Sequence, residues 1–328
     1  MKNIQADIKS GNFKQVYLLY GKEAYLKQQY KQNLVKALNP DGDTMNFNHY
    51  EGKGIDVKQL IDLCETMPFF AERRVVLLED TGFFKNKCEE LADYMKELPD
   101  YLYLVFAETE VDKRNRMYKA VKACGSIAEF IRQDEKTLMR WAAGILGKAG
   151  KKITQRDMEL LLTKTGTDMG NLRMEMEKLI SYTEGRDVVT AEDIEEICTT
   201  QTTNRIFDMV RAVTEKNQKR ALELYYDLLT LKEPPMRILF LLAKQYRQLL
   251  LAKQFAAAGL AQTEIASKLG VPGFVVRNIT TCARAYTISE LEQAVKDFVD
   301  AEESVKTGRL EDKLSVELLI IKYSSKVK

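Results

Sequence analysis

The sequence contains a single histidine, His49, and only five cysteines among its 328 residues. The cysteines are widely scattered and no Cys-x-x-Cys pair occurs, so the pattern argues against a zinc site. Nucleophilic catalysis by a Cys–His or Ser–His pair would depend on His49, and no motif around that residue supports it. We therefore expect no metal, no cofactor and no catalytic residues.

Excess charge and long apolar runs are also missing. The formal net charge of +2 argues against a chain dedicated to coating nucleic acid, although a local basic face stays open. No apolar run is long enough to span a bilayer, and residues 1–9 are polar rather than signal-like. We expect a cytoplasmic globular protein that makes no membrane contact.

The remaining composition is that of a globular protein, and 328 residues are too many for one ordinary core. Residues 1–135 alternate short apolar strands with helical segments, which predicts an α/β domain with a five-stranded parallel sheet. Residues 136–203 and 204–328 show helical periodicity and no convincing strand, which predicts a small and a larger all-α domain. The expected strands are 16–20, 45–50, 74–78, 101–107 and 126–131, and the helices between them are 23–38, 57–66, 88–98 and 116–124. The helices expected after residue 135 are 136–148, 155–165, 170–182, 191–199, 205–214, 218–231, 235–258, 263–269, 273–286, 289–308 and 313–323.

The turn after the first predicted strand occupies the position of a phosphate-binding loop. Such a loop reads Gly-x-x-x-x-Gly-Lys-Ser/Thr; its backbone amides cradle phosphates and its hydroxyl holds magnesium. Here Gly21 and Lys22 are present, but Glu23 replaces the hydroxyl residue and Val16 replaces the first glycine. Glu23 would place a repulsive carboxylate beside the phosphates. The favoured interpretation is that Gly21 makes a strand-to-helix turn, and a divergent nucleotide-binding ATPase stays as an alternative.

Two further features bear on the same question. Glu79 and Asp80 end the third strand, where a nucleotide-hydrolysing sheet carries its magnesium-binding and water-activating carboxylates. Without a phosphate loop these acids have nothing to act on, so we interpret them as a solvated strand end. Arg173 follows Gly170 at a helix start, where nucleotide-driven switch proteins use an arginine that reaches the phosphates. Because the partner loop is defective, we favour a structural contact between domains for Arg173.

The segment 263–271 resembles the first helix and turn of a helix-turn-helix. Ala266 and Gly270 have the expected four-residue spacing, and the next helix carries Arg277 and Asn278, which can reach bases. A small-residue corner between packed helices needs the same pattern. The balanced charge and the long helical context favour the corner, and a sequence-specific DNA-binding protein stays as an alternative.

The most informative stretch is 65–80. Between a short predicted helix and a predicted strand it contains Met67, Pro68, Phe69 and Phe70. Neighbouring side chains on a helical turn lie about 100° apart, so Phe69 and Phe70 cannot both face inward from one turn. A projecting apolar pair on a soluble protein usually marks a contact with a partner pocket. The alternative, in which both rings belong to the core, stays open on spacing alone.

An α/β domain, a small helical domain and a larger helical domain, in this order and with a disabled phosphate loop, form a recognisable combination. The chain resembles the delta subunits of bacterial DNA polymerase III clamp loaders over nearly its whole length. The resemblance rests on three segments, 16–26, 67–74 and 170–180. It implies a fold of the ATPase-associated type, a helical lid at 136–203 and a carboxy-terminal helical collar at 204–328.

The same resemblance implies a site and partners. Members of this family neither bind nor hydrolyse ATP, which agrees with Glu23, and they join motor subunits (tau or gamma) and a delta-prime subunit in a heteropentamer. They bind the ring-shaped sliding clamp (beta) through a hydrophobic pair at the tip of the first domain. That pair corresponds to Phe69 and Phe70, flanked by Met67 and Pro68. The family often has an aliphatic residue in the first place, so Phe69 is a mild departure.

The function expected from the resemblance is that of a non-catalytic subunit that binds and opens the clamp for loading onto primed DNA during replication. ATP binding by neighbouring subunits would expose the phenylalanine pair, and hydrolysis would withdraw it. The resemblance also implies a degenerate nucleotide site, not expected to bind ATP, made of Gly21, Lys22, Glu23 and Arg173. The alternatives are the helix-turn-helix-like DNA-binding protein, the divergent ATPase, and an assembly protein in which both phenylalanines are core.

Overall fold

Five parallel strands form one sheet in the amino-terminal part of the computed structural model, which describes residues 2–199, 202–271 and 273–325. The strands are β1 (Val16–Tyr20), β2 (Phe47–Glu51), β3 (Arg74–Glu79), β4 (Leu102–Glu108) and β5 (Ser126–Glu129). Their order is β2-β3-β4-β1-β5, so β1 lies inside the sheet between β4 and β5. This arrangement confirms the predicted parallel sheet.

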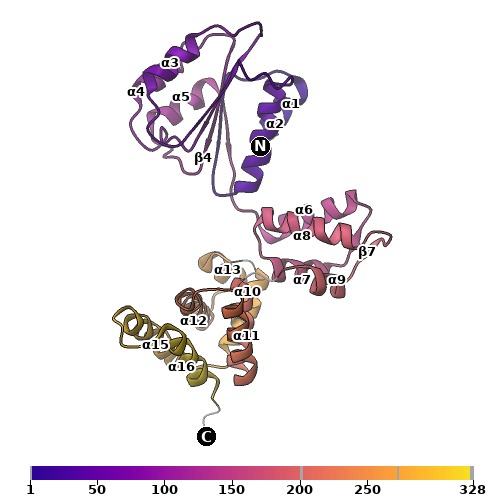
Figure 1. The fold of residues 1–328 in the computed structure, drawn as a ribbon, viewed down its shortest axis with the longest axis vertical. Helices are drawn as coiled ribbons and strands as arrows, with labels where there is room; N and C mark the ends of the chain where they lie inside the picture. The colour runs from indigo at the N-terminus through magenta and orange to yellow at the C-terminus, as the bar shows by residue number, and fades with distance from the viewer. Residues whose placement is uncertain (1, 200–201, 272, 326–328) are drawn as a thin grey trace. The chain divides into compact units, whose positions relative to one another are not determined.

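Helices cover both faces of the sheet. One face packs against α1 (Lys2–Ser10) and α2 (Ala24–Leu38), and the other packs against α3 (Val57–Glu65), α4 (Glu89–Tyr94) and α5 (Arg116–Cys124) (Figure 1). Successive strand residues point to opposite faces. In β1, Val16 and Leu18 therefore join the core under α3, α4 and α5, whereas Tyr17 and Leu19 join the core under α1 and α2.

Two helices of this unit differ clearly from the sequence prediction, and the observed ends of β2 and β5 differ from the predicted ranges 45–50 and 126–131 by one or two residues. The helix α1 was not predicted, because the segment is polar apart from a few positions; Ile4 is fully buried against the sheet and anchors it. The hydroxyl of Tyr17 donates a hydrogen bond to Asp7 Oδ2 at 2.9 Å, which ties α1 to β1. The helix predicted at 88–98 is shorter, because α4 ends at Tyr94.

Contacts divide the chain into two units, Met1–Gln133 and Asp134–Lys328. The unit boundary lies close to the predicted boundary at residue 135. The predicted division of the second part into 136–203 and 204–328 stays a prediction, and the outermost predicted ends at residues 1 and 328 lie outside the described residues.

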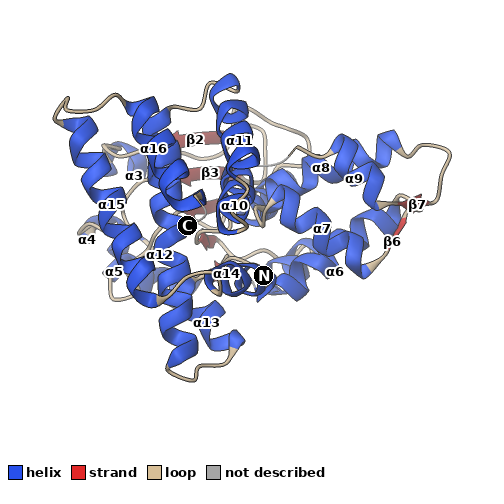
Figure 2. Ribbon diagram, turned by 90° about the horizontal axis from the view of Figure 1, so that it is seen from below, coloured by secondary structure: helices blue, strands red, loops and turns tan. Residues whose placement is uncertain are grey.

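The second unit begins with α6 (Glu135–Lys148), α7 (Gln155–Thr165), α8 (Met169–Tyr182) and α9 (Ala191–Ile197). The prediction that no strand follows residue 135 is wrong, because β6 (Lys152–Ile153) pairs in parallel with β7 (Val188–Val189) (Figure 2). Two residues per strand are too few to produce a visible alternation of apolar and polar residues.

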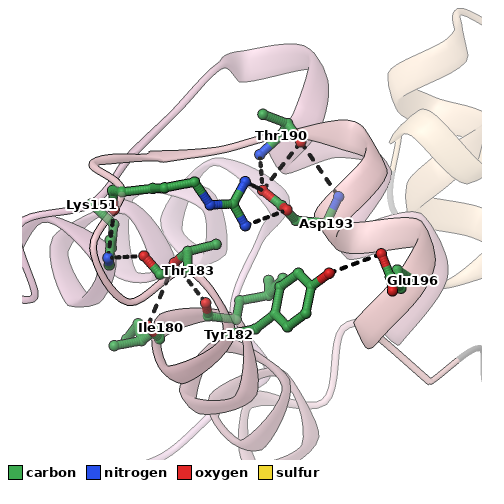
Figure 3. A network of polar contacts seen from close by, with 9 residues as sticks. Lys151, Ile180, Tyr182, Thr183, Thr190, Asp193 and Glu196 are labelled. Carbon is green, nitrogen blue, oxygen red and sulfur yellow. Dashed lines mark hydrogen bonds and ion pairs between the residues drawn. The ribbon is translucent and has the colours of Figure 1, made fainter.

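A polar network fixes the ends of this strand pair (Figure 3). Lys151 Nζ donates to the backbone carbonyls of Thr183 and Arg186, at 2.6 Å each. The Arg186 guanidinium pairs with Asp193 at 2.8 Å. Asp193 also completes a capping box with Thr190 at the start of α9.

The remaining helices share one core. They are α10 (Thr202–Thr214), α11 (Gln218–Thr230), α12 (Pro235–Ala257), α13 (Gln262–Leu269), α14 (Gly273–Ala283), α15 (Ile288–Lys306) and α16 (Asp312–Ser324). The central helix is α12, which packs against α10, α13, α14, α15 and α16 (Figure 2). It begins at Pro235, the first residue of the helix predicted at 235–258, and proline is favoured at this first helical position. The ring of Tyr246 lies in the middle of this core, against three other rings, those of Tyr286, Phe298 and Tyr323.

Candidate functional site

The loop of residues 66–73, which connects α3 to β3, carries the largest exposed apolar side chains of the first unit. Phe70 is 95% exposed, Met67 is 75% exposed and Phe69 is 58% exposed, while Pro68 is half-buried. The alternative in which both phenylalanines belong to the core is therefore wrong. The two rings contact each other edge to face, with centroids 4.6 Å apart, and so form one apolar projection. We call Phe69 and Phe70 the phenylalanine pair.

Two buried polar side chains hold the backbone of this loop. Asn46, just before β2, accepts from the Phe69 N–H at 2.6 Å and donates to the Phe69 carbonyl at 2.8 Å. Arg74, the first residue of β3, donates to the carbonyls of Thr66 at 2.9 Å and Met67 at 3.2 Å. Sequence reasoning missed the role of Asn46, because nothing local to residue 46 indicates a loop that lies 23 positions further along the chain.

The turn at residues 21–23 lies at the carboxyl ends of the strands, where α/β sheets bind ligands. Gly21 has a φ of +126°, and a Cβ atom there would meet the carbonyl oxygen of Phe130 at 2.2 Å. The Gly21 N–H donates to the Glu108 carbonyl and the Glu23 N–H donates to the Phe130 carbonyl. A phosphate loop directs such amides at phosphates. Here both amides are already used in hydrogen bonds to backbone carbonyls. The geometry supports the interpretation of Gly21 as a strand-to-helix turn.

A pocket of about 720 Å³ nevertheless opens beside this turn, lined in part by Gly21, Lys22 and Arg132. Two of its lysines are already paired, Lys85 with Glu110 at 2.5 Å and Lys113 with Glu129 at 2.8 Å. Lys22 is exposed, and Glu23 is buried at the start of α2. The pocket therefore offers mixed charge rather than the concentrated donors that a triphosphate requires.

The expectation of a solvated acidic end of β3 is wrong for Glu79, which is ion-paired, whereas Asp80 is exposed as expected. Lys31 from α2 pairs with Glu79 at 2.6 Å, and His49 from β2 lies 2.9 Å from the same carboxylate. Asp80 Oδ1 accepts from the Thr109 N–H at 2.8 Å. Glu79 therefore acts as a structural partner of Lys31, and Asp80 supports the turn after β4 through one carboxylate oxygen. The only histidine of the chain belongs to this ion-paired cluster.

Glu108 and Lys27 lie in the same region. The Glu108 carboxylate is buried and accepts from the N–H and the hydroxyl of Thr81, at 3.0 Å and 2.6 Å. Burial raises the pKa of the Glu108 carboxyl and lowers the pKa of the Lys27 ammonium. Such paired, desolvated groups are typical of a structural network as well as of an active site.

Arg173 forms an ion pair within α8, where its Nε donates to Glu177 Oε1 at 2.7 Å. Lys22 belongs to the first unit and Arg173 to the second. The contact between domains expected for Arg173 stays a prediction, as does its membership of the degenerate nucleotide site.

The helix-turn-helix-like segment forms a real helix pair. The helices α13 and α14 pack together, and Gly270 ends α13 with the left-handed φ of +65°. Val276 and Ile279 are buried in the core, whereas Arg277 is exposed and lies 3.7 Å from Glu159. The corner interpretation accounts for the small residue and the buried positions, and readout of DNA sequence stays untested.

Other classes of site find little support in the described residues. Among residues 2–199, 202–271 and 273–325, no cluster of three or more Cys, His, Asp or Glu could hold a metal ion. In the same part of the chain, no helix has the length and apolar character needed to cross a membrane. Burial raises the pKa of the Cys64 thiol to about 12, which keeps it from acting as a nucleophile at neutral pH.

Comparisons with known proteins identify the family. A family model described as DNA polymerase III, delta subunit matches residues 17–130, and a second model, for the C-terminal domain of the same subunit, matches residues 203–323. The DNA polymerase III subunit delta of Bacillus subtilis (strain 168) is 26% identical over 332 residues, which cover 97% of this chain and 95% of the relative. This chain belongs to the DNA polymerase III delta subunit family.

The fold agrees with that assignment. The solved structure of the Bacillus subtilis DNA clamp loader delta protein superimposes with a TM-score of 0.68 and 24% identity, and 99% of each chain is covered. The first family model spans β1 to β5 and therefore includes both the 66–73 loop and the turn at residues 21–23. The recognition made from the sequence is confirmed at the level of the delta subunit family.

Proposed function

We propose that this delta-family protein is a non-catalytic clamp-loader subunit that binds the sliding clamp and favours its opened form during replication. The observation that carries the proposal is the phenylalanine pair, an exposed apolar projection on a loop whose backbone is held by buried side chains. Exposed aromatic side chains of this size are typical anchors for a pocket on a partner protein. Met67 and Pro68 flank the pair and would extend the contact with the clamp.

The pair would act by differential binding. A ligand shifts a conformational equilibrium only by the difference in its affinity for the two states. The phenylalanine pair would open the clamp if its pocket is more accessible, or better shaped, when one clamp interface is relaxed. Motor subunits would supply the ATP-driven exposure and withdrawal of the pair, and primed DNA would reach this subunit through the complex. The subunit itself would bind no nucleotide at Gly21, Lys22, Glu23 and Arg173.

The helix α16 supports assembly with further chains. Val316, Leu319 and Ile320 are buried in the core of the carboxy-terminal helices, whereas Leu314, Leu318 and Ile321 form a second, exposed apolar stripe. A helix that is apolar on two faces usually packs on both sides. We assign the exposed stripe to contacts with the motor subunits (tau or gamma) and delta-prime in a heteropentamer, which belongs to the cytoplasmic DNA polymerase III holoenzyme.

Equilibrium binding of the full-length subunit to its sliding clamp tests this function. The variant Phe69→Ala/Phe70→Ala is expected to lose at least about 100-fold in affinity, because each aromatic anchor contributes about 2 kcal/mol or more. Both rings are exposed, so the free energy of unfolding should change little.

A matched control is available in Phe240→Ala. Phe240 is 59% exposed, nearly the same as Phe69, but it lies on α12 in the other unit. This control should bind the clamp like the wild type. Wild-type affinity in the double variant would sink the proposed site, and absence of clamp binding by the wild type would sink the proposed function.

A further inference from the structure

The loop that carries the phenylalanine pair is tied down by an unusual use of one side chain. Asn46 is 3% exposed, and it makes both an accepted and a donated hydrogen bond with the backbone of the single residue Phe69. Two bonds to one residue reproduce the exchange seen between opposed residues of two strands. The Asn46 N–H₂ group also donates to Asp43 Oδ2 at 2.5 Å, which fixes the orientation of the amide.

Asp43 is itself held in place. Its backbone N–H donates to Asn39 Oδ1 at 2.9 Å, and its Oδ1 atom accepts from the Met45 N–H at 2.8 Å. Hydrogen bonds from the Asn46 side chain and from the Met45 backbone keep the pKa of the Asp43 carboxyl below its usual range. A hydrogen-bonded chain therefore runs from the end of α2 through Asp43 and Asn46 to the backbone of Phe69.

Arg74 fixes the other end of the loop. Its guanidinium is buried and donates to the carbonyls of Thr66 and Met67 and to the Asn48 side-chain oxygen, the last at 3.2 Å. Carbonyls at the end of α3 have no partner inside that helix, so these bonds satisfy groups that would otherwise be open. Lysine could not reproduce this contact, because it lacks the planar fork of donors.

The backbone directly after the tie at Phe69 is strained. Phe70 has a φ of +49°, in the left-handed region that residues other than glycine rarely adopt. Such a conformation persists only when the surrounding structure determines it. Left to itself, an exposed aromatic pair would also tend to fold back onto nearby apolar surface. The left-handed backbone at Phe70 therefore depends on support from the residues around it.

We propose that Asn46 and Arg74 are positioning residues that lock the 66–73 backbone, so that the phenylalanine pair already has its binding geometry before the clamp arrives. The inference rests on the proposed function, since the partner is the same clamp. Preorganisation raises affinity because the loop loses less conformational freedom on binding. The two residues act through the rings and make no contact with the clamp themselves.

The wild-type protein provides the first test. The Phe69 amide lies in an exposed loop, yet its donated bond to Asn46 should protect it from hydrogen exchange in the free subunit. Exchange of this amide at the rate of an unstructured peptide would overturn the inference. This measurement needs no variant and is independent of clamp binding.

The variant Asn46→Ala provides the second test. Loss of both ties should speed exchange at Phe69 and lower clamp affinity about tenfold, with both rings still present. The matched control is Asn115→Ala. Asn115 ties another loop of the same unit, by donating to the Asn86 carbonyl at 2.9 Å, and it caps α5, so its loss should reduce stability but leave clamp affinity unchanged.

A double-mutant cycle separates positioning from general destabilisation. In a Phe69→Ala/Phe70→Ala background the affinity lost on Asn46→Ala should shrink to less than about threefold, because Asn46 acts through the two rings that this background lacks. An undiminished loss would contradict the inference. If Asn46→Ala binds the clamp like the wild type while Phe69→Ala/Phe70→Ala binds it weakly, the positioning role is refuted and the proposed function stands. If Phe69→Ala/Phe70→Ala itself binds like the wild type, the proposed function is refuted.

Discussion

The 66–73 loop precedes β3 and the turn at residues 21–23 follows β1, so the two lie at opposite ends of one parallel sheet. In the loop, buried side chains satisfy the backbone, and the apolar side chains point to solvent. In the turn, the backbone amides are used by neighbouring strand ends, and Gly21 packs against a carbonyl. The difference indicates where partners can bind. In the loop, side chains from other segments satisfy the backbone, so the loop's own side chains stay available for a partner. In the turn, the backbone amides bond to neighbouring carbonyls, so none is left to bind a phosphate.

The largest expected effect on stability comes from replacing Gly21 in the turn. Gly21→Ala should lower the free energy of unfolding by about 3 kcal/mol or more, because the new Cβ would lie 2.2 Å from the Phe130 oxygen and the φ of +126° suits only glycine. Urea unfolding measures the change. The exposed neighbour Lys22 is the control, and Lys22→Ala should stay within about 0.5 kcal/mol of the wild type. Equal stability of Gly21→Ala and wild type would mean that the close approach does not exist.

The loop should respond to glycine in the opposite sense. The free energy of unfolding of Phe70→Gly should be about 1 kcal/mol higher than that of Phe70→Ala, because glycine adopts the left-handed φ of +49° without steric cost. Both variants lose the same ring and should bind the clamp equally weakly. If the alanine variant is the more stable of the two, Phe70 does not hold the strained conformation described above.

The buried carboxyl beside the turn gives the smallest expected effect. Burial raises the pKa of Glu108 above its ordinary value of 4.5, so the folded protein binds this proton more tightly than the unfolded chain does. Stability contributed by protonated Glu108 is therefore present at low pH and is lost as pH rises from 4.5 through the raised pKa. Glu108→Gln keeps an acceptor for Thr81 and should remove this downward slope. Parallel pH profiles for the two proteins would show that Glu108 does not titrate as described.

Local patterns were enough to predict most of the sheet and its helices. The run of apolar residues in β1 is predicted with the observed ends, and α7 and α5 also match. Patterns failed where an element is short or weakly apolar: β6 and β7 have two residues each, and α1 is anchored mainly by the buried side chain of Ile4. Such elements form because the surrounding fold stabilises them, and their own residues carry little signal.

The candidate site was predicted only in part, for a related reason. The apolar pair at Phe69 and Phe70 is visible in the sequence, because two adjacent phenylalanines cannot both face the core from one turn. Its supports are not visible, since Asn46 reaches the loop from 23 positions away. The same holds at the end of β3, where Glu79 meets Lys31 across 48 positions and the expected solvated acid becomes an ion pair. Long-range pairs of polar residues have no sequence period.

Hydrogen exchange of the full-length subunit, alone and with its sliding clamp, tests the central comparison most directly. We expect the clamp to slow exchange of backbone amides in the 66–73 loop. The exchange rates of the amides from Gly21 to Lys27, at the opposite end of the sheet, should not change. Slower exchange at that turn, with no change in the loop, would contradict the assignment of the phenylalanine pair as the clamp-binding site.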